Sequence, residues 1–222
     1  MVGRKTMNIE KKITQIWIGP NPAPMKWMNT WKEKHPDWTY EIFTDDMLHS
    51  RKWMNQHLIE HYYNTRKYCG VSDLIRYELL LERGGFFPEA DMECLENTEE
   101  LFDAPSNRAY TCYENETYRP NFVQPILACN PGNLFVRMVV ETLYQVKAEN
   151  LHPEPFRSTG NEFLARHVPN NLDKLKIWPS HYFIPQFYVR EAKRYDGPDK
   201  IYAEHHWGST GMPWTQQYNT AI

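Results

Sequence analysis

Residues 71–95 read VSDLIRYELLLERGGFFPEADMECL, and this stretch decides the fold class. Between residues 71 and 83, apolar side chains recur at the spacing of one helix face: Leu74, Ile75, Leu79 and Leu80. Gly84 and Gly85 follow directly. Because glycine readily adopts left-handed backbone, we expect them to end the helix in an αL conformation. We expect a strand over residues 86–95, bent or at a sheet edge because of Pro88.

Helices and strands alternate in the same way along the first half of the chain. The patterns predict strands at residues 13–19, 38–43, 109–113, 123–129, 177–179 and 200–203, and helices at 24–35, 44–63, 134–147 and 159–167. Such alternation predicts an α/β fold. Since no linker divides the chain, we expect one domain over residues 1–222, in which residues 1–10 need not be ordered.

The composition argues against several classes of protein. A net charge of -3 gives no basic footprint of the kind that nucleic-acid binding requires. The four cysteines lie far apart without CxxC spacing, which argues against a zinc site or a disulfide framework. No apolar run approaches the roughly 18 residues of a membrane span, and the polar N-terminus lacks a signal peptide. We therefore expect a cytoplasmic protein with reduced thiols. Aromatic residues make up 14% of the chain, and we expect most of them to fill the core.

Three acids stand at alternate positions after the glycine pair: Glu89, Asp91 and Glu93. In a regular strand they share one face, where their repulsion calls for water or a cation. Carboxylate oxygens suit Mg²⁺ or Mn²⁺, whose remaining ligands are often phosphates. A solvated edge strand explains the acids equally well, so both interpretations stay open on this pattern alone.

Asp73 and Arg76 are three residues apart on one face of the preceding helix. A local ion pair of little energetic worth is the simplest interpretation. The alternative is a ligand site, because α/β sheets bind ligands beyond the carboxyl ends of their strands. Arg76 would then face a phosphate and Asp73 a sugar hydroxyl.

Four segments in this order resemble a known family: QIWIG at residues 15–19, HPDW at 35–38, SDLIRY at 72–77 and GGFFPEAD at 84–91. Together they resemble the glycosyltransferases with the DXD sugar-binding motif, of the family 32 type. That group includes the yeast initiating α-1,6-mannosyltransferase and is related to the clostridial glucosylating toxins.

The resemblance implies a GT-A fold, a Rossmann-like arrangement with a mainly parallel central sheet. It also implies a UDP- or GDP-sugar donor and Mn²⁺ or Mg²⁺. Residues 11–95 would form the nucleotide-sugar-binding half, and residues 96–222 the acceptor side and a C-terminal closing segment. The acceptor would be a glycan, a lipid or a protein.

Carried over by position, the resemblance assigns Trp17 to the base, and Ile18 and Gly19 to the wall of the nucleotide pocket. Asp73 and Arg76 match an Asp-x-x-Arg motif that holds the ribose, sugar or phosphate of the donor.

Asp91 matches the second Asp of DXD, the more dependable metal ligand. Glu89 stands at the first Asp, one methylene longer, and Glu93 is its competitor for the metal. We expect Asp91, Arg76 and Glu89 to be the catalytic residues.

Two later segments resemble the family less closely. Residues 158–161, Ser-Thr-Gly-Asn, resemble a Thr-Gly-Pro helix entry, and residues 204–209, EHHWGS, resemble a His-x-Trp segment that closes over the diphosphate. On this basis we assign His206 to the metal, and His206, Trp207 and Ser209 to the donor.

The function implied is metal-dependent sugar transfer to an acceptor hydroxyl, with retention of configuration at the sugar. Two alternatives remain open. Asp91 and Glu93 could act as the carboxylate pair of a glycoside hydrolase, which needs neither metal nor nucleotide. A carbohydrate-binding domain could use the many Trp and Tyr faces without catalysis.

Overall fold

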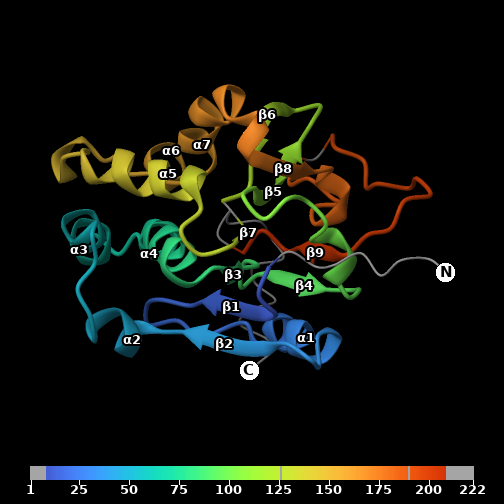
Figure 1. Cartoon of the computed structure of the whole chain (residues 1–222), viewed down its shortest axis with the longest axis horizontal. Helices are drawn as coiled ribbons and strands as arrows, with labels where there is room; N and C mark the ends of the chain where they lie inside the picture. Colours follow the sequence, from blue (N-terminus) through green and yellow to red (C-terminus); the bar gives the residue numbers. More distant parts are fainter. Residues whose placement is uncertain (1–8, 126, 190, 209–222) are drawn as a thin grey trace.

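A computed structural model describes residues 9–125, 127–189 and 191–208 (Figure 1). Its α-helices are α1 (Met25–Lys34), α2 (Asp45–His49), α3 (Gln56–Asn64), α4 (Tyr68–Arg83), α5 (Leu134–Tyr144), α6 (Pro155–Ser158) and α7 (Asn161–His167). Its strands are β1 (Lys12–Ile16), β2 (Thr39–Phe43), β3 (Gly85–Phe86), β4 (Met92–Cys94), β5 (Ala109–Asn115), β6 (Arg119–Val123), β7 (Ala128–Cys129), β8 (Leu175–Trp178) and β9 (Ala203–His205).

The central sheet has seven strands in the order β2-β1-β3-β7-β5-β6, with β8 paired to β5. β1 is parallel to both β2 and β3, and β8 is parallel to β5, whereas β7 and β6 are antiparallel to their neighbours. Five strands therefore run one way and two run the other. The α/β fold class with a mainly parallel central sheet is confirmed.

The strand predicted over residues 86–95 is two strands. β3 ends at Phe86, and β4 begins at Met92 and pairs with β9 in a separate two-stranded sheet. Pro88 lies in the break and cannot donate to a strand ladder, which explains why pairing stops there. The expectation that the acids lie on one regular strand face is therefore wrong.

The helix ends at Gly84, as predicted, but its conformation differs from the expected αL. Gly84 has φ 61° and ψ -160°, a combination open essentially to glycine alone. A Cβ there would lie 2.7 Å from the Cys129 carbonyl oxygen, and one on Gly85 would lie 3.0 Å from the Lys12 carbonyl oxygen. The two glycines let α4 turn directly into the sheet.

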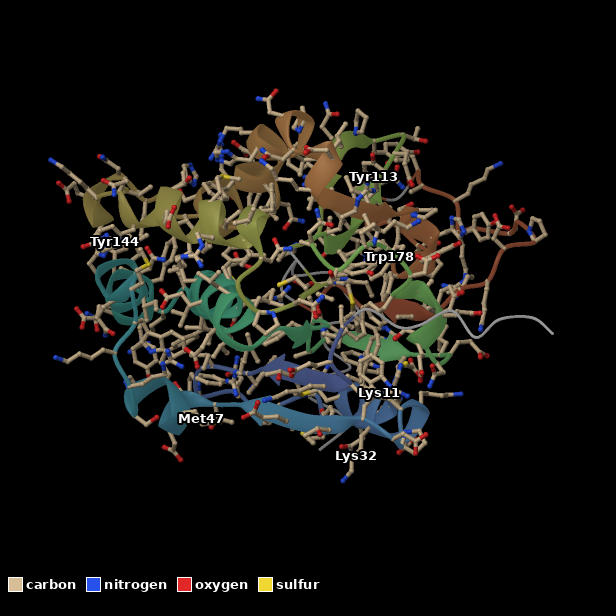
Figure 2. The ribbon with its side chains drawn as sticks, in the orientation of Figure 1. Lys11, Lys32, Met47, Tyr113, Tyr144 and Trp178 are labelled. Atoms are coloured by element: carbon tan, nitrogen blue, oxygen red, sulfur yellow. The ribbon has the colours of Figure 1, made fainter. Side chains whose placement is uncertain are left out.

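Two groups of buried side chains form the core. One lies around α3, α4 and α5, on the left in Figure 1. The other is rich in aromatic rings: Trp178, labelled in Figure 2, stacks on Tyr110 and Phe183 with centroids 5.3 and 5.2 Å apart. The prediction that the aromatic residues fill the core is confirmed for the described rings in this group.

The structure also bears on the expectations for the cysteines, for membrane-spanning helices and for the N-terminal residues. All four cysteines are free. No helix within the described ranges has the length and apolar character needed to cross a bilayer. Residues 1–8 lie outside the described residues, while Ile9 is buried in the aromatic group.

Candidate functional site

The carboxyl ends of β1, β2 and β3 meet at one edge of the sheet, because the three strands are parallel. Residues 17–19 leave β1 at this edge. There the Gly19 amide donates to Asp45 Oδ2 at 3.0 Å, and Gly19 has φ 106°. A Cβ on Gly19 would lie 2.6 Å from the Tyr68 ring, so glycine allows the close approach of α4. The partly exposed Trp17 donates from its indole to the Asn21 carbonyl at 2.7 Å.

A cluster of possible metal ligands follows β3. Atoms of Glu89, Asp91 and His205 all lie within 4.8 Å of one another. His205 Nε2 is 2.8 Å from Glu89 Oε2 and 3.5 Å from Asp91 Oδ1. Two carboxylate oxygens and one imidazole nitrogen at this separation can converge on one divalent cation, and carboxylate-rich donor sets suit Mn²⁺ or Mg²⁺.

Charge in the cluster shifts two pKa values. Burial opposes ionisation of Glu89, but the hydrogen bond from His205 and the charge of Arg76 bring the pKa of Glu89 below its usual value. Burial also opposes protonation of His205, but Asp91 and Glu89 raise the pKa of that imidazole. The cluster therefore attracts positive charge.

The segment after β9 closes the cluster from the far end of the chain. The His206 amide donates to the Asp91 carbonyl at 2.9 Å, and the Gly208 amide to Asp91 Oδ2 at 2.8 Å. Between them Trp207 has φ 54°, which is unusual for a bulky side chain and carries strain. This strained turn directs the Trp207 amide to His205 Nδ1 at 3.1 Å.

The structure brings His205, rather than His206, to Glu89 and Asp91. His206 Nε2 lies 3.0 Å from Glu93 Oε2, and its ring stacks on Trp27 with centroids 4.0 Å apart. Glu93, the suggested competitor for the metal, is engaged in this contact. Ser209 lies outside the described residues.

Arg76 reaches the cluster from α4. Its Nη2 lies 3.5 Å from Glu89 Oε1, and only 6% of its side chain is exposed. Within the described part of the chain, Nε and Nη1 of Arg76 are buried without a hydrogen-bond partner. Buried unsatisfied donors are costly, so an anionic ligand with several acceptor oxygens, such as a diphosphate, fits this guanidinium.

Asp73 lies one helical turn earlier and is also buried. Burial, partly offset by Arg76, raises the pKa of Asp73 to about 7. The Thr159 hydroxyl donates to Asp73 Oδ2 at 3.0 Å, and a Cβ on Gly160 would lie 3.1 Å from the same oxygen. The Thr-Gly pair of the helix entry therefore packs directly on Asp73.

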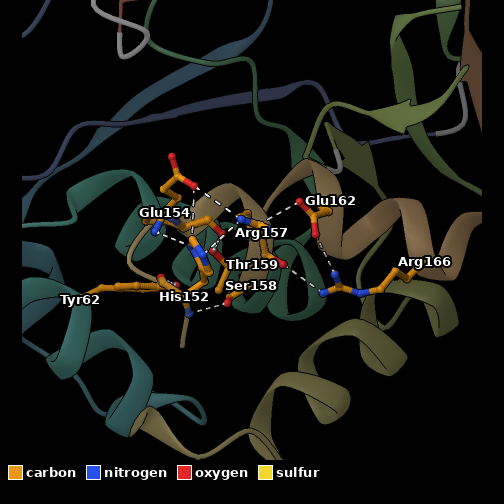
Figure 3. A network of polar contacts seen from close by, with 9 residues as sticks. Tyr62, His152, Glu154, Arg157, Ser158, Thr159, Glu162 and Arg166 are labelled. Carbon is orange, nitrogen blue, oxygen red and sulfur yellow. Dashed lines mark hydrogen bonds and ion pairs between the residues drawn. The ribbon is translucent and has the colours of Figure 1, made fainter. Parts of the chain in front are cut away.

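Figure 3 shows how the chain before Thr159 is held in place. The Ser158 hydroxyl accepts from the His152 amide at 2.8 Å, and the His152 carbonyl accepts from the Tyr62 hydroxyl at 3.1 Å. Arg157 and Arg166 share the Glu162 carboxylate at 3.3 and 3.4 Å. These contacts anchor the Thr159 segment to α3 and α7.

Sequence reasoning missed several residues of this region. Gln15 donates to the Glu89 carbonyl at 3.0 Å and accepts from the Tyr40 hydroxyl at 2.7 Å, so it fixes the loop that carries Glu89. Asp45, which accepts from the Gly19 amide, lies near the start of the helix predicted at residues 44–63, and nothing else in the sequence pointed to it. The signal for Gln15 was weak, since a polar residue in a strand usually faces solvent, whereas this one is fully buried.

Comparison with known families supports the resemblance predicted from the motifs. Residues 22–108 match the family described as the glycosyltransferase sugar-binding region containing the DXD motif. The matched region includes Asp73, Arg76, Glu89 and Asp91. The predicted resemblance is confirmed there.

Inositol phosphoceramide mannosyltransferase 3 of Schizosaccharomyces pombe (strain 972 / ATCC 24843) is 24% identical over 229 residues. The alignment covers 90% of this chain and 60% of that protein, so this chain spans 60% of the length of its relative.

Solved structures of glycosyltransferases are among those similar to this chain. The PaToxG glycosyltransferase aligns with a TM-score of 0.59 at 16% identity, over 74% of this chain and 70% of that one. This likeness confirms the GT-A fold. A glycosyltransferase involved in the glycosylation of the major capsid of PBCV-1 aligns over 94% of this chain and 97% of that one, with a TM-score of 0.47 and 11% identity.

Proposed function

We propose that this chain transfers a sugar from a nucleoside diphosphate sugar to an acceptor hydroxyl, with Mn²⁺ or Mg²⁺ held by Glu89, Asp91 and His205. The observation that carries the proposal is the buried guanidinium of Arg76. It has two donors without a partner in the described chain, and it lies beside the cluster. The acidic cluster would bind a cation, and the guanidinium beside it lacks acceptors for two of its nitrogens. A diphosphate with its bound metal ion would satisfy both.

Each group at the site has a defined part in this proposal. Arg76 donates to the phosphate oxygens and stabilises the charge that develops on the leaving diphosphate. A divalent cation bound at the cluster would supply further neutralisation of the same charge. Asp73, oriented by Thr159, accepts from a hydroxyl of the donor sugar.

The nucleotide would lie over the same sheet edge. Trp17 offers a ring to the base, and Ile18 and Gly19 line the pocket, with Gly19 fixed by Asp45. The segment that contains Trp207 and Gly208 would cover the diphosphate. A role for the side chains of His206 and Ser209 in binding the donor remains a prediction. The family resemblance implies retention of configuration at the sugar. Because the sequence offers no convincing nucleophile, we favour a same-face substitution guided by the leaving phosphate.

The relative from S. pombe is named as a mannosyltransferase, so GDP-mannose is the first donor to test, with UDP-glucose beside it. Glycan, lipid and protein hydroxyls are all candidate acceptors. Thermal unfolding with GDP and UDP, each with and without Mn²⁺, should show stabilisation only by a nucleotide that binds the folded chain.

Asp91→Asn is the decisive variant. It removes one carboxylate charge and should abolish Mn²⁺-dependent nucleotide binding and donor turnover, including hydrolysis. Glu93→Gln is the matched control, because Glu93 lies two residues away and contacts His206 instead. Unchanged metal dependence in Asp91→Asn would reject the proposal, and so would glycoside hydrolysis that persists in EDTA.

A further inference from the structure

The buried carboxylate of Glu114 on β5 lies outside the groups assigned to the donor. Its side chain is 3% exposed, although a carboxylate is seldom so buried without a purpose or a partner. Arg119 Nη1 donates to Oε2 at 3.2 Å, and Asn161 Nδ2 donates to Oε1 at 3.1 Å. Each oxygen of an ionised carboxylate has two lone pairs, so both can accept a further hydrogen bond.

One short segment of chain places Glu114 beside the donor site. Residues 159–161 contact both carboxylates: the Thr159 hydroxyl donates to Asp73, and Asn161 Nδ2 donates to Glu114. Two residues of chain span at most about 7 Å, so Asp73 and Glu114 are held from neighbouring points of one rigid segment.

Arg119, which donates to Glu114, also contacts a group of aromatic rings. Tyr118 stacks on Phe187 with centroids 5.9 Å apart, and Arg119 donates to the neighbouring Tyr188 hydroxyl at 2.5 Å. Phe187 meets Trp207 edge-on at 5.5 Å, and Trp207 adjoins His205 at 4.3 Å. A line of rings therefore runs from the candidate metal cluster to Tyr118, whose residue surface is 46% exposed.

We propose that Glu114 and Tyr118 form the acceptor subsite and bind a cyclic polyol, either a pyranose or a cyclitol. This inference rests on the sugar transfer proposed above. The Glu114 carboxylate accepts from a ring hydroxyl, while Arg119 and Asn161 hold it in position and can donate to the adjacent hydroxyl. The Tyr118 ring packs on the apolar face of the same polyol. Glu114 forms no covalent bond in this role.

The combination of groups favours a polyol over a peptide or a lipid tail. Alternating donors and acceptors around one carboxylate match neighbouring hydroxyls, each of which both donates and accepts. A lipid tail would gain nothing from a buried carboxylate and guanidinium, because it has no hydrogen-bonding group for them.

The KM values of Glu114→Gln for acceptor and for donor distinguish the proposed acceptor subsite from the proposed sugar transfer. With methyl α-mannopyranoside and myo-inositol as acceptor probes, the acceptor KM of the productive probe should rise about 10- to 100-fold, the loss expected for a hydrogen bond to a charged group. The donor KM and the Kd of the nucleotide with Mg²⁺ should stay within twofold, on the order of experimental scatter. Which probe responds tells a pyranose from a cyclitol.

Matched controls exclude a general effect on folding. Glu116→Gln alters another carboxylate two residues away, which accepts from the Ser180 amide, and should leave the acceptor KM unchanged. Tyr118→Ala should raise the acceptor KM, whereas Tyr144→Ala should not, although Tyr144 on α5 is similarly exposed at 49%. Tyr118→Phe keeps the ring and should restore acceptor binding.

The possible failures are distinguishable. If no nucleoside diphosphate binds the wild-type chain, the sugar transfer itself is rejected. If nucleotide binds but neither probe does by saturation-transfer NMR, or if Glu114→Gln raises the donor and acceptor KM equally, only the acceptor subsite is rejected. A normal acceptor KM in Tyr118→Ala would remove Tyr118 from the subsite.

Discussion

Nη2 of Arg76 lies 3.5 Å from Oε1 of Glu89, and the two residues reach this position from α4 and from the loop after β3. The contact uses Nη2 of the guanidinium. The two other nitrogens, Nε and Nη1, are buried without a partner in the described chain. Arg76 is thus positioned by an acid of the candidate metal cluster, while Nε and Nη1 keep their hydrogen-bonding capacity unsatisfied.

Arg76→Lys should weaken Mn²⁺-dependent binding of the nucleoside diphosphate by about 10- to 100-fold, because lysine keeps the charge but loses the fork of donors. The free energy of unfolding should not fall by a similar amount, because the substitution also removes buried donors that have no hydrogen-bond partner. Isothermal titration and urea unfolding measure the two effects. Arg83→Lys, in the last turn of the same helix, is the control and should bind nucleotide normally.

Asp73 should make stability depend on pH. Its pKa is raised to about 7 in the folded chain from 3.8, so the folded state binds the proton more tightly than the unfolded state. Its contribution to stability is therefore complete below pH 3.8 and is lost as the pH rises to about 7. The resulting fall in the free energy of unfolding is at most about 4 kcal/mol.

Asp73→Asn removes the titrating group, so its advantage in melting temperature over the wild type should grow between pH 4 and pH 7. Melting curves across this range test the sign. A constant difference between the two proteins would contradict the raised pKa.

Gly84→Ala should lower the free energy of unfolding by roughly 3 kcal/mol or more, because its backbone angles and the Cys129 carbonyl both exclude a Cβ. Gly132→Ala is the control. Gly132 also has a positive φ of 71°, but a Cβ there meets nothing within 4 Å, so its loss should be about 1 kcal/mol. Equal losses in urea unfolding would show that the close approach at Gly84 is unimportant.

Glu78→Gln should cost about 1–3 kcal/mol of stability. The buried Glu78 carboxylate accepts from the amides of Met54 and Asn55 at 2.8 and 2.7 Å, and an amide NH₂ would face one of these donors. Glu82→Gln on the same helix breaks only the exposed pair with Arg51 and should cost less than about 1 kcal/mol. A similar loss in both variants would argue against the buried contact.

The local parts of the fold could be predicted from the sequence. α4 and its glycine stop follow from apolar spacing and the special backbone of Gly84. The pairing of β4 with β9 could not be predicted, because it joins residues more than 100 positions apart and depends on the bend at Pro88. Short strands such as β3 and β7 have too few residues to show an alternating pattern.

The same distinction applies to the site. Asp73, Arg76, Glu89 and Asp91 lie within 19 positions, so motif spacing was enough to group them. The choice between His205 and His206 depended on strand register. β9 pairs His205 with Met92, and adjacent side chains alternate between faces, so only one of the two imidazoles can turn toward Glu89.

The small sheet of β4 and β9 also sets the order in which the site can form. Glu89 and His205 are 116 positions apart. Closing so long a loop costs more conformational entropy than forming the contacts of α4, so it should be slower. In refolding, burial around α4 should precede recovery of nucleotide binding. On the ribosome, a nascent chain can bury the side chains around α3, α4 and α5 before His205 joins Glu89 and Asp91 in the candidate metal cluster.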